Sequence, residues 1–302
     1  MRRKYYMLDV FTQTPLSGNP LAVVFDAEGL DTARMQAIAR EFNLSETVFV
    51  FDPRDPINTA HIRIFTPGRE LPFAGHPTVG TAILLATLRA PELLAREDIG
   101  VVLEEAVGKV SCTVRHIKGQ APRASFDLPR LPALVGALGP DAAIAAALGL
   151  TPGDISFGAH TPARYSAGVP FACVPVASRA ALARITLNLT GWQAAFGEAL
   201  APIFVYCDDP EGKGHSFRAR MFAPDMGIAE DPATGAAVAA FAGAVMACDA
   251  PADGDHTLVI EQGFEMGRPS LITLGLVVEG SKLTTASIGG HAVLLAEGVL
   301  DV

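Results

Sequence analysis

The strongest constraint on the fold is an internal repeat of one strand-loop-helix unit. The first copy runs from Arg-Ile-Phe-Thr-Pro at residues 63–67 to Ala-Gly-His-Pro-Thr-Val-Gly-Thr-Ala at residues 74–82. The second runs from Arg-Met-Phe-Ala-Pro at residues 220–224 to Glu-Asp-Pro-Ala-Thr-Gly-Ala-Ala at residues 230–237. The repeat predicts two similar domains that face each other across a cleft. Each would present one helix N-terminus, where free N–H groups and the helix dipole favour a small anion.

Length and charge narrow the possible functions. A chain of 302 residues favours two domains over one. Its formal net charge is -9 and it has no Lys/Arg run, which argues against nucleic acid as a partner. No apolar run approaches the roughly 20 residues of a membrane span, and no signal-like cleavage region follows the basic start. We therefore expect a cytoplasmic protein, with no membrane partner, that acts on a small anionic metabolite.

The sequence predicts neither a metal nor a cofactor. Its cysteines lie outside any C-x-x-C or Cys/His cluster, and they are Cys112, Cys173, Cys207 and Cys248. We interpret them as reduced, small hydrophobic side chains. The chain also lacks the glycine-rich motifs of dinucleotide and nucleoside triphosphate sites.

The order of predicted elements is rich in strands, with one long helix in each half. The helices are expected over residues 77–88 and 234–248, and an amphipathic helix is expected over residues 31–43. We predict a first domain over residues 1–118, a polar crossover over 118–130 and a second domain over 130–287. A last hairpin, residues 288–302, is expected to turn near Gly298 and to pack back onto the first domain.

Glu46 is the first candidate for chemistry. It lies between the predicted amphipathic helix and an apolar strand at residues 48–51. Burial there would raise the pKa of its carboxyl toward the range useful for proton transfer. The alternative is an exposed loop glutamate or a satisfied residue at a strand end.

His76 and Asp231 lie at corresponding helix starts in the two copies. The positive end of the helix would favour a neutral His76 that contacts a ligand. The alternatives are a capping histidine and an Asp231 that serves as the N-cap of its helix. Gly75 and Gly235 would let the backbone approach a ligand closely.

These residues lie within motifs by which the chain resembles a known family. The motifs occupy residues 8–12, 16–23, 35–47, 63–67, 70–78 and 230–235. In this order and spacing the chain is identified as a member of the PhzF-like family, a group of isomerases named for phenazine biosynthesis. The matches extend almost from end to end.

The resemblance implies an α+β fold of the diaminopimelate-epimerase type. Two pseudo-symmetric domains would each wrap a curved, mostly antiparallel sheet around a central helix. The active site would lie between them and would need no cofactor or metal, and the protein would be a homodimer. Glu46 matches the catalytic glutamate that moves a proton between two carbons. The positions expected to bind substrate are His76, Asp231, Gly75, Gly235, Ala236 and Thr234.

Three alternatives bear on this interpretation. Phenazine isomerases resemble Asp-Pro-Ala-Thr-Gly-Ser where this chain has Ala236, so a substrate other than the phenazine precursor is expected. A two-thiol racemase would place a cysteine in each helix-opening loop, and neither loop has one. A homologue that binds a metabolite without turning it over remains an alternative, although Glu46 argues for turnover.

Overall fold

The computed structural model describes residues 2–197, 201–224 and 228–302. The chain divides into two compact units. Unit 1 comprises Met1–Asp127 and Gly289–Val302, and unit 2 comprises Leu128–Ile288. Both are mixed assemblies of sheet and helix, so the α+β class is confirmed.

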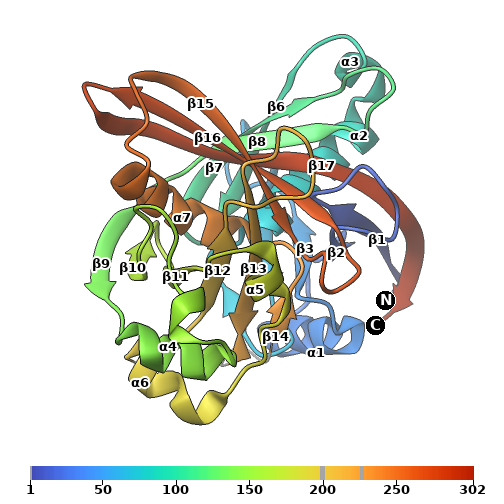
Figure 1. Cartoon of the computed structure of the whole chain (residues 1–302). Helices are drawn as coiled ribbons and strands as arrows, with labels where there is room; N and C mark the ends of the chain where they lie inside the picture. Colours follow the sequence, from blue (N-terminus) through green and yellow to red (C-terminus); the bar gives the residue numbers. More distant parts are fainter. Residues whose placement is uncertain (1, 198–200, 225–227) are drawn as a thin grey trace. The chain divides into compact units, whose positions relative to one another are not determined.

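Unit 1 contains both ends of the chain (Figure 1). Its elements are β1 (Arg2–Val10), β2 (Asn19–Val24), α1 (Thr32–Phe42), β3 (Glu46–Phe51), β4 (Ala60–Phe65), β5 (Glu70–Leu71), α2 (Gly75–Arg89), α3 (Pro91–Leu94), β6 (Ile99–Glu105), β7 (Gly108–Arg115), β8 (Arg123–Asp127) and the end of β17 (Lys282–Asp301). Arg2 pairs with Asp301 where β1 runs antiparallel to β17.

Unit 2 is a contiguous stretch of chain. Its elements are β9 (Ala133–Ala137), α4 (Asp141–Leu148), β10 (Ala163–Ser166), β11 (Pro170–Pro175), α5 (Arg179–Ala183), α6 (Trp192–Phe196), β12 (Ile203–Cys207), β13 (Phe217–Ala223), β14 (Ile228–Asp231), α7 (Gly235–Cys248), β15 (Gly254–Gln262), β16 (Ser270–Glu279) and the first part of β17. Short 3-10 turns occupy Pro152–Asp154 and Leu189–Gly191.

The strands of the two units pair in the same order. In unit 1, β2 is antiparallel to β1 and parallel to β3, while β4 is antiparallel to β3 and β5 and parallel to β6. In unit 2, β11 is antiparallel to β10 and parallel to β12, while β13 is antiparallel to β12 and β14 and parallel to β15. The sequence repeat therefore corresponds to a repeated pattern of strand pairing.

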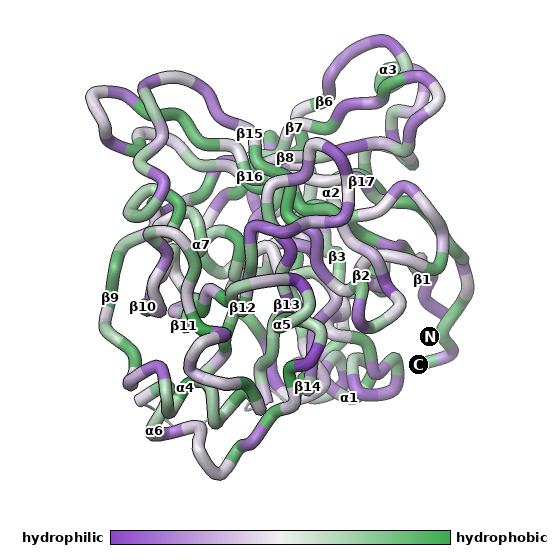
Figure 2. Tube along the Cα trace, in the orientation of Figure 1, coloured by the Kyte–Doolittle hydropathy of each residue, from purple (hydrophilic) through white to green (hydrophobic). Residues whose placement is uncertain are grey.

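Each unit encloses one apolar helix. α2 contacts strands β1, β2, β3, β6, β7 and β8, and all its residues from Gly75 to Ala86 are buried. α7 contacts β9, β10, β11 and β16, and it is buried along most of its length. Both helices are predominantly hydrophobic (Figure 2). Because they lack a polar face, only a surrounding sheet can accommodate them.

A glycine sets how closely each central helix approaches its sheet. A Cβ on Gly80 of α2 would lie 2.7 Å from side-chain carbons of both Leu21 and Val10. A Cβ on Gly243 of α7 would lie 2.5 Å from the Tyr165 ring. Leu21 and Val10 are fully buried, so neither can move aside without disturbing the packing around it.

A second repeated feature is an arginine that braces the loop before each central helix. Arg63 on β4 makes a bidentate pair with Glu70 at 2.6 Å for both bonds, and its guanidinium lies 5.2 Å from the centre of the Phe65 ring. Arg220 on β13 makes the corresponding bidentate pair with Glu230 at 2.8 Å for both bonds. Such forked pairs hold planar groups in a defined orientation.

A buried carboxylate holds the preceding loop in each unit. Glu104 accepts the backbone N–H groups of Arg54 and Asp55, each at 2.9 Å. Glu261 accepts the backbone N–H groups of Glu211 and Gly212. Hydrogen bonding, first from Asn58 and then from Asp55, lowers the pKa of Glu104 to about 2. The two glutamates occupy equivalent positions in the parallel strand pairs. Glu104 of β6 lies opposite His61 of β4, and Glu261 of β15 lies opposite Arg218 of β13.

Of two sequence predictions about the chain path, the crossover over residues 118–130 is incomplete, although the boundary between the two units lies within it, and the terminal hairpin is wrong. Residues 118–130 are not only a crossover, because Ala124 and Phe126 alternate with polar residues to form β8. The hairpin expected over residues 288–302 is instead the end of the single strand β17. Gly298 does not mark a turn: it pairs with Tyr5, and a Cβ there would lie 2.6 Å from the Tyr5 ring.

The packing of Gly80 gives a test of the fold. Gly80→Ala is expected to lower the free energy of unfolding by about 1–3 kcal/mol, as overpacked cores generally do. This loss should occur although alanine is more favourable than glycine inside a helix by about 1 kcal/mol. Urea unfolding followed by circular dichroism measures it. Gly100→Ala, at a site with no atoms within 4 Å of the added Cβ, is the matched control. Equal or greater stability of Gly80→Ala would contradict the packing argument.

Candidate active site

The start of α2 brings its first turn into the interior of unit 1. Gly75 is the first helical residue and His76 the second, and both are buried. The N-cap residue, Ala74, makes no side-chain capping bond. The N-cap side chain thus offers no acceptor to the first-turn N–H groups, which makes this end suited to an anionic group.

The Glu46 carboxyl lies beside the His76 ring. Glu46 opens β3, where the parallel register places it opposite Leu21 of β2. Its Oε2 is 3.4 Å from Nδ1 of His76, and the two side chains are 12% and 4% exposed. The Asn19 amide nitrogen also lies 3.4 Å from His76 Nδ1. Three polar side chains from three elements therefore meet at one buried point.

The His76 ring is neutral at physiological pH. Burial disfavours the imidazolium form and lowers the pKa of His76 to about 3. When Nδ1 accepts from Asn19, Nε2 carries the hydrogen. Among the residues that the structure describes, Nε2 has no hydrogen-bond partner. A neutral imidazole with a free donor can bind an oxygen of a ligand without adding positive charge beside Glu46.

The start of α7 carries a different hydrogen-bond network. The Thr234 hydroxyl donates to Oδ2 of Asp231, whose side chain is buried. The Gln262 amide donates to the Asp231 carbonyl at 2.8 Å, and its oxygen accepts the Thr234 N–H at 3.1 Å. The network fixes the loop that precedes the helix.

The interpretation of Asp231 as an N-cap is wrong. α7 begins at Gly235 with Thr234 as its N-cap, and Asp231 ends the strand β14. Proline follows Asp231, but the chain needs three more residues before the helix begins. Gly235 is buried like Gly75, and Ala236 is half-buried at the second helical position, where α2 has His76.

Sequence reasoning missed two members of these clusters, Asn19 and Gln262. Both are fully buried polar residues. The Gly-Asn-Pro sequence around Asn19 is typical of a turn, and Gln262 lies at the end of an apolar stretch. Neither residue type signals the strand register that brings it to a helix start.

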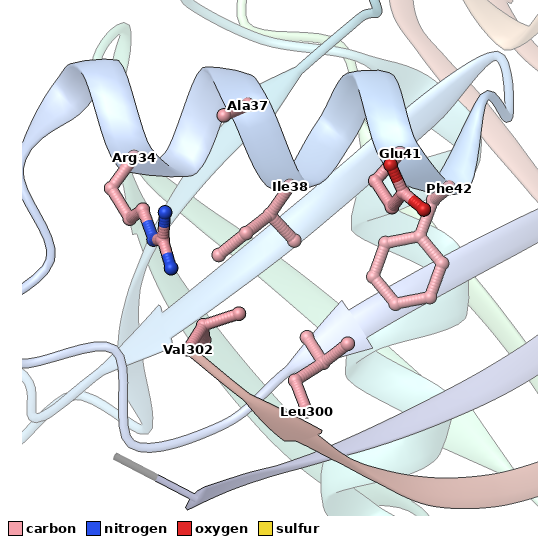
Figure 3. Close-up of a pocket in the computed structure, with 7 residues that line it drawn as sticks. All are labelled: Arg34, Ala37, Ile38, Glu41, Phe42, Leu300 and Val302. Carbon is pink, nitrogen blue, oxygen red and sulfur yellow. The ribbon is translucent and has the colours of Figure 1, made fainter.

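A cavity elsewhere in unit 1 contains none of the predicted site residues. It measures about 280 Å³ and is lined by Arg34, Ala37, Ile38, Glu41, Phe42, Leu300 and Val302. Figure 3 shows α1 side chains on one side of it and the two C-terminal side chains opposite. Its lining residues within the described part of the chain include no acid beside an imidazole, unlike the Glu46–His76 pair.

Comparison with known proteins shows the family of the chain. A family model described as phenazine biosynthesis-like protein matches residues 8–298. The chain belongs to this family. It is 52% identical over 305 residues to an uncharacterized isomerase of Mesorhizobium japonicum, with 99% of both chains covered. It is 36% identical over 296 residues to the trans-2,3-dihydro-3-hydroxyanthranilate isomerase of Pseudomonas chlororaphis, with 98% of both covered.

The solved structures agree with this assignment. The phenazine biosynthesis protein of the PhzF family from Bacillus anthracis matches with a TM-score of 0.88 and 26% identity, and the whole of both chains is covered. The resemblance to PhzF-like proteins is thus confirmed. Because the curated relatives are named isomerases, the chain is an isomerase of this family.

The described part of the chain offers neither a metal-binding cluster nor a membrane-spanning helix. Within residues 2–197, 201–224 and 228–302, no group of three or more His, Cys, Asp and Glu side chains is arranged to hold a metal ion. No helix in those same ranges is long and apolar enough to span a membrane.

The buried imidazole predicts a specific acid sensitivity. Unfolded histidine binds a proton near pH 6.5, whereas folded His76 does so only near 3. Between these values the unfolded state binds more protons, so stability falls by about 1.4 kcal/mol for each pH unit of acidification. His76→Gln should lack this loss in unfolding experiments from pH 7 to pH 4. His116→Gln, at an exposed position, is the control. Parallel pH profiles for all three proteins would show that His76 titrates normally.

Proposed function

We propose that this isomerase moves a proton between two carbons of a small carboxylate-bearing metabolite, an amino or hydroxy acid, without a cofactor. The observation that carries the proposal is the Glu46 carboxyl 3.4 Å from Nδ1 of a buried, neutral His76. A partly buried carboxyl held beside a neutral ring is suited to general acid-base work. Relatives named as isomerases support the reaction class.

The proposed reaction balances with one proton and no electron transfer. The Glu46 carboxylate removes a proton from one substrate carbon, and the electron pair left behind is delocalised over the adjacent unsaturated system. The resulting carboxylic acid returns the proton to a second carbon. Because base and acid are the same group, water must be excluded while the proton is held. Substrate and product differ only in the positions of a hydrogen and a double bond.

The remaining site residues are assigned to substrate binding. In unit 1, His76 Nε2 and the N–H of Gly75 are proposed to bind substrate oxygens. In unit 2, Asp231 is proposed to accept from a substrate amine or hydroxyl beside the first turn of α7, with Thr234 and Gly235. Helix N-termini can stabilise charge that develops as the proton leaves. The pseudo-symmetry of the two units and a substrate site in a cleft between them stay predictions, as does a homodimer.

The structure offers little support for the thiol alternative. Cys112, Cys173 and Cys207 are buried free cysteines. Burial, followed by the neighbouring Glu105, raises the pKa of Cys112 to about 12, and burial raises that of Cys173 further. A two-base thiol mechanism needs reactive thiolates, and these groups are protonated at neutral pH.

Deuterium exchange tests the role of Glu46. In heavy water, NMR would follow deuterium entering carbon positions of a panel of cyclic and acyclic amino and hydroxy acids that includes trans-2,3-dihydro-3-hydroxyanthranilate. Glu46→Gln should slow exchange by about 10²–10⁴-fold, the usual contribution of a general base, and should leave the fold intact. Glu41→Gln, at an exposed position on α1, should behave like the wild type.

The outcomes separate catalysis from binding alone. Equal exchange by Glu46→Gln and wild type would exclude Glu46 as the base. A compound that binds but shows no exchange with the wild-type protein would favour a binding protein that has lost turnover. Calorimetry with the same panel supplies the binding measurement.

Ala236 gives a test of substrate choice. The resemblance to phenazine isomerases implies serine at this position, so Ala236→Ser introduces that hydroxyl in the first turn of α7. One added hydrogen bond contributes about 0.5–1.5 kcal/mol, equivalent to an increase of up to about tenfold in kcat/KM for trans-2,3-dihydro-3-hydroxyanthranilate. Ala180→Ser, on the exposed face of α5, is the control. No change would show that this position does not discriminate between substrates.

A further inference from the structure

A buried glutamate outside the proposed chemistry contacts the first turn of α2. Glu105, the last residue of β6, is 6% exposed. Its Oε1 lies 2.8 Å from the Thr78 hydroxyl. The same hydroxyl lies 2.8 Å from the Ala74 carbonyl oxygen. Thr78 is two residues beyond His76, so this contact ties β6 to the turn that carries the imidazole.

The hydrogens in this cluster can be counted. A threonine hydroxyl has one hydrogen to donate and can accept from others. An ionised Glu105 would only accept, and the Ala74 carbonyl only accepts, so one hydrogen would serve two acceptors. A protonated Glu105 removes the conflict: the acid donates to Thr78, and Thr78 donates to Ala74. Both distances of 2.8 Å then correspond to complete hydrogen bonds.

The corresponding residue of unit 2 already carries a donor. His61 pairs with Glu104 in the parallel register of unit 1, and Arg218 pairs with Glu261 in that of unit 2. The next residues along β6 and β15 are Glu105 and Gln262. The Gln262 amide donates to the Thr234 hydroxyl at 3.1 Å, at the start of α7. A neutral Glu105 would perform in unit 1 what an amide performs in unit 2.

The surroundings of Glu105 favour its neutral form. Burial raises the pKa of Glu105 to about 8, and the bond from Thr78 acts in the opposite direction. Two titratable groups on the packed elements are uncharged at neutral pH, His76 on α2 and Cys112 on β7. Oε2 of Glu105 has no hydrogen-bond partner within the described residues. Burying an unpaired charged carboxylate oxygen costs far more free energy than burying the unpaired carbonyl oxygen of a neutral acid.

The charged side chains near Glu105 pair with residues other than Glu105. A cavity of about 90 Å³ is lined in part by Glu105, Arg54, His61, Arg63 and Glu70. Arg63 pairs with Glu70 at 2.6 Å, and the Arg54 guanidinium lies 3.1 Å from His61 Nε2. The adjacent Glu104 accepts from the loop before β4. Among the described residues, none of these cations forms an ion pair with Glu105.

We propose that Glu105 is a positioning residue that acts as a neutral carboxylic acid, donating to Thr78 and holding the first turn of α2, with His76, in place. Its ionisation in alkaline solution releases that turn. The structural part stands on the hydrogen-bond geometry, and the effect on catalysis rests on the proposed function of His76.

A buried neutral acid has a thermodynamic signature that does not require substrate. The unfolded carboxyl loses its proton near pH 4.5 and the folded one near pH 8. Between these values the folded state binds one more proton at Glu105, so the contribution of Glu105 to stability falls as the pH rises. The unfolding equilibrium constant should increase about tenfold per pH unit from this group alone. Above pH 8 this contribution becomes constant.

The first experiment compares urea unfolding of the wild type and Glu105→Gln at each pH unit from 5 to 9. Gln cannot ionise and keeps a donor. The ratio of wild-type to variant unfolding constants should rise about tenfold per unit from pH 5 to 8 and then level off. Glu97→Gln, at an exposed site, should show no such rise relative to wild type. A ratio independent of pH would overturn the proposal, because Glu105 would then be ionised in the native state.

The second experiment tests positioning. Infrared spectra should show a protonated-carboxyl band at pH 7 that disappears in Glu105→Gln, and its titration reports ionisation of Glu105. The NMR signals of the His76 ring should be preserved in Glu105→Gln and shifted in Glu105→Leu, which has no donor. An unchanged ring signal in Glu105→Leu would show that the hydrogen bond does not position His76.

A third experiment tests whether ionisation of Glu105 changes the rate of the proposed reaction. Deuterium exchange by wild-type protein should fall as the pH passes about 8, in step with the infrared titration, and Glu105→Gln should retain activity there. If both proteins lose activity together, ionisation of Glu105 does not limit the reaction. If no compound exchanges at any pH, the proposed function fails, while the unfolding and infrared results still decide the state of Glu105.

Discussion

The structure depends on the burial of two helix starts. α2 and α7 are enclosed along almost their whole length, so their first turns lie inside their units rather than at the surface. Buried N–H groups must be satisfied by side chains, water or a ligand. Polar side chains lie beside both of these helix starts. The strands supply them: Glu46 and Asn19 at α2, and Gln262 at α7.

The two helix starts share a framework of contacts and differ in their polar side chains. The bracing arginine, the carboxylate that holds the preceding loop and the glycine that opens the helix recur in both units. The chemistry does not recur. One turn has an imidazole beside an acid, whereas the other has an aspartate held by threonine and glutamine. The repeated framework therefore carries different polar groups at its two helix starts.

Much of this arrangement could be predicted from local sequence, and the failures have physical causes. The motif around His76 marks a helix start because glycine, proline and an apolar run occur together. The Asp-Pro sequence at residue 231 also predicts a helix start, but three more residues precede the first residue of α7. Asn19, Gln262 and Glu105 reach the helix starts through pairing between distant strands, and no local periodicity reports that register. Gly298 is another example. Its neighbours in the sequence predict a turn, but glycine is needed there because the Tyr5 ring of β1, far away in the sequence, packs against it.

The path of β17 has a consequence for biosynthesis. Unit 2 is a single continuous segment, whereas unit 1 needs residues 289–302 to give β1 its second neighbour. During synthesis from the N-terminus, β1 therefore remains an open edge until residues 292–301 have been made. Such an edge can pair with other chains. Unit 2 can complete its hydrophobic core first, and the first-made half of the protein is the last to close.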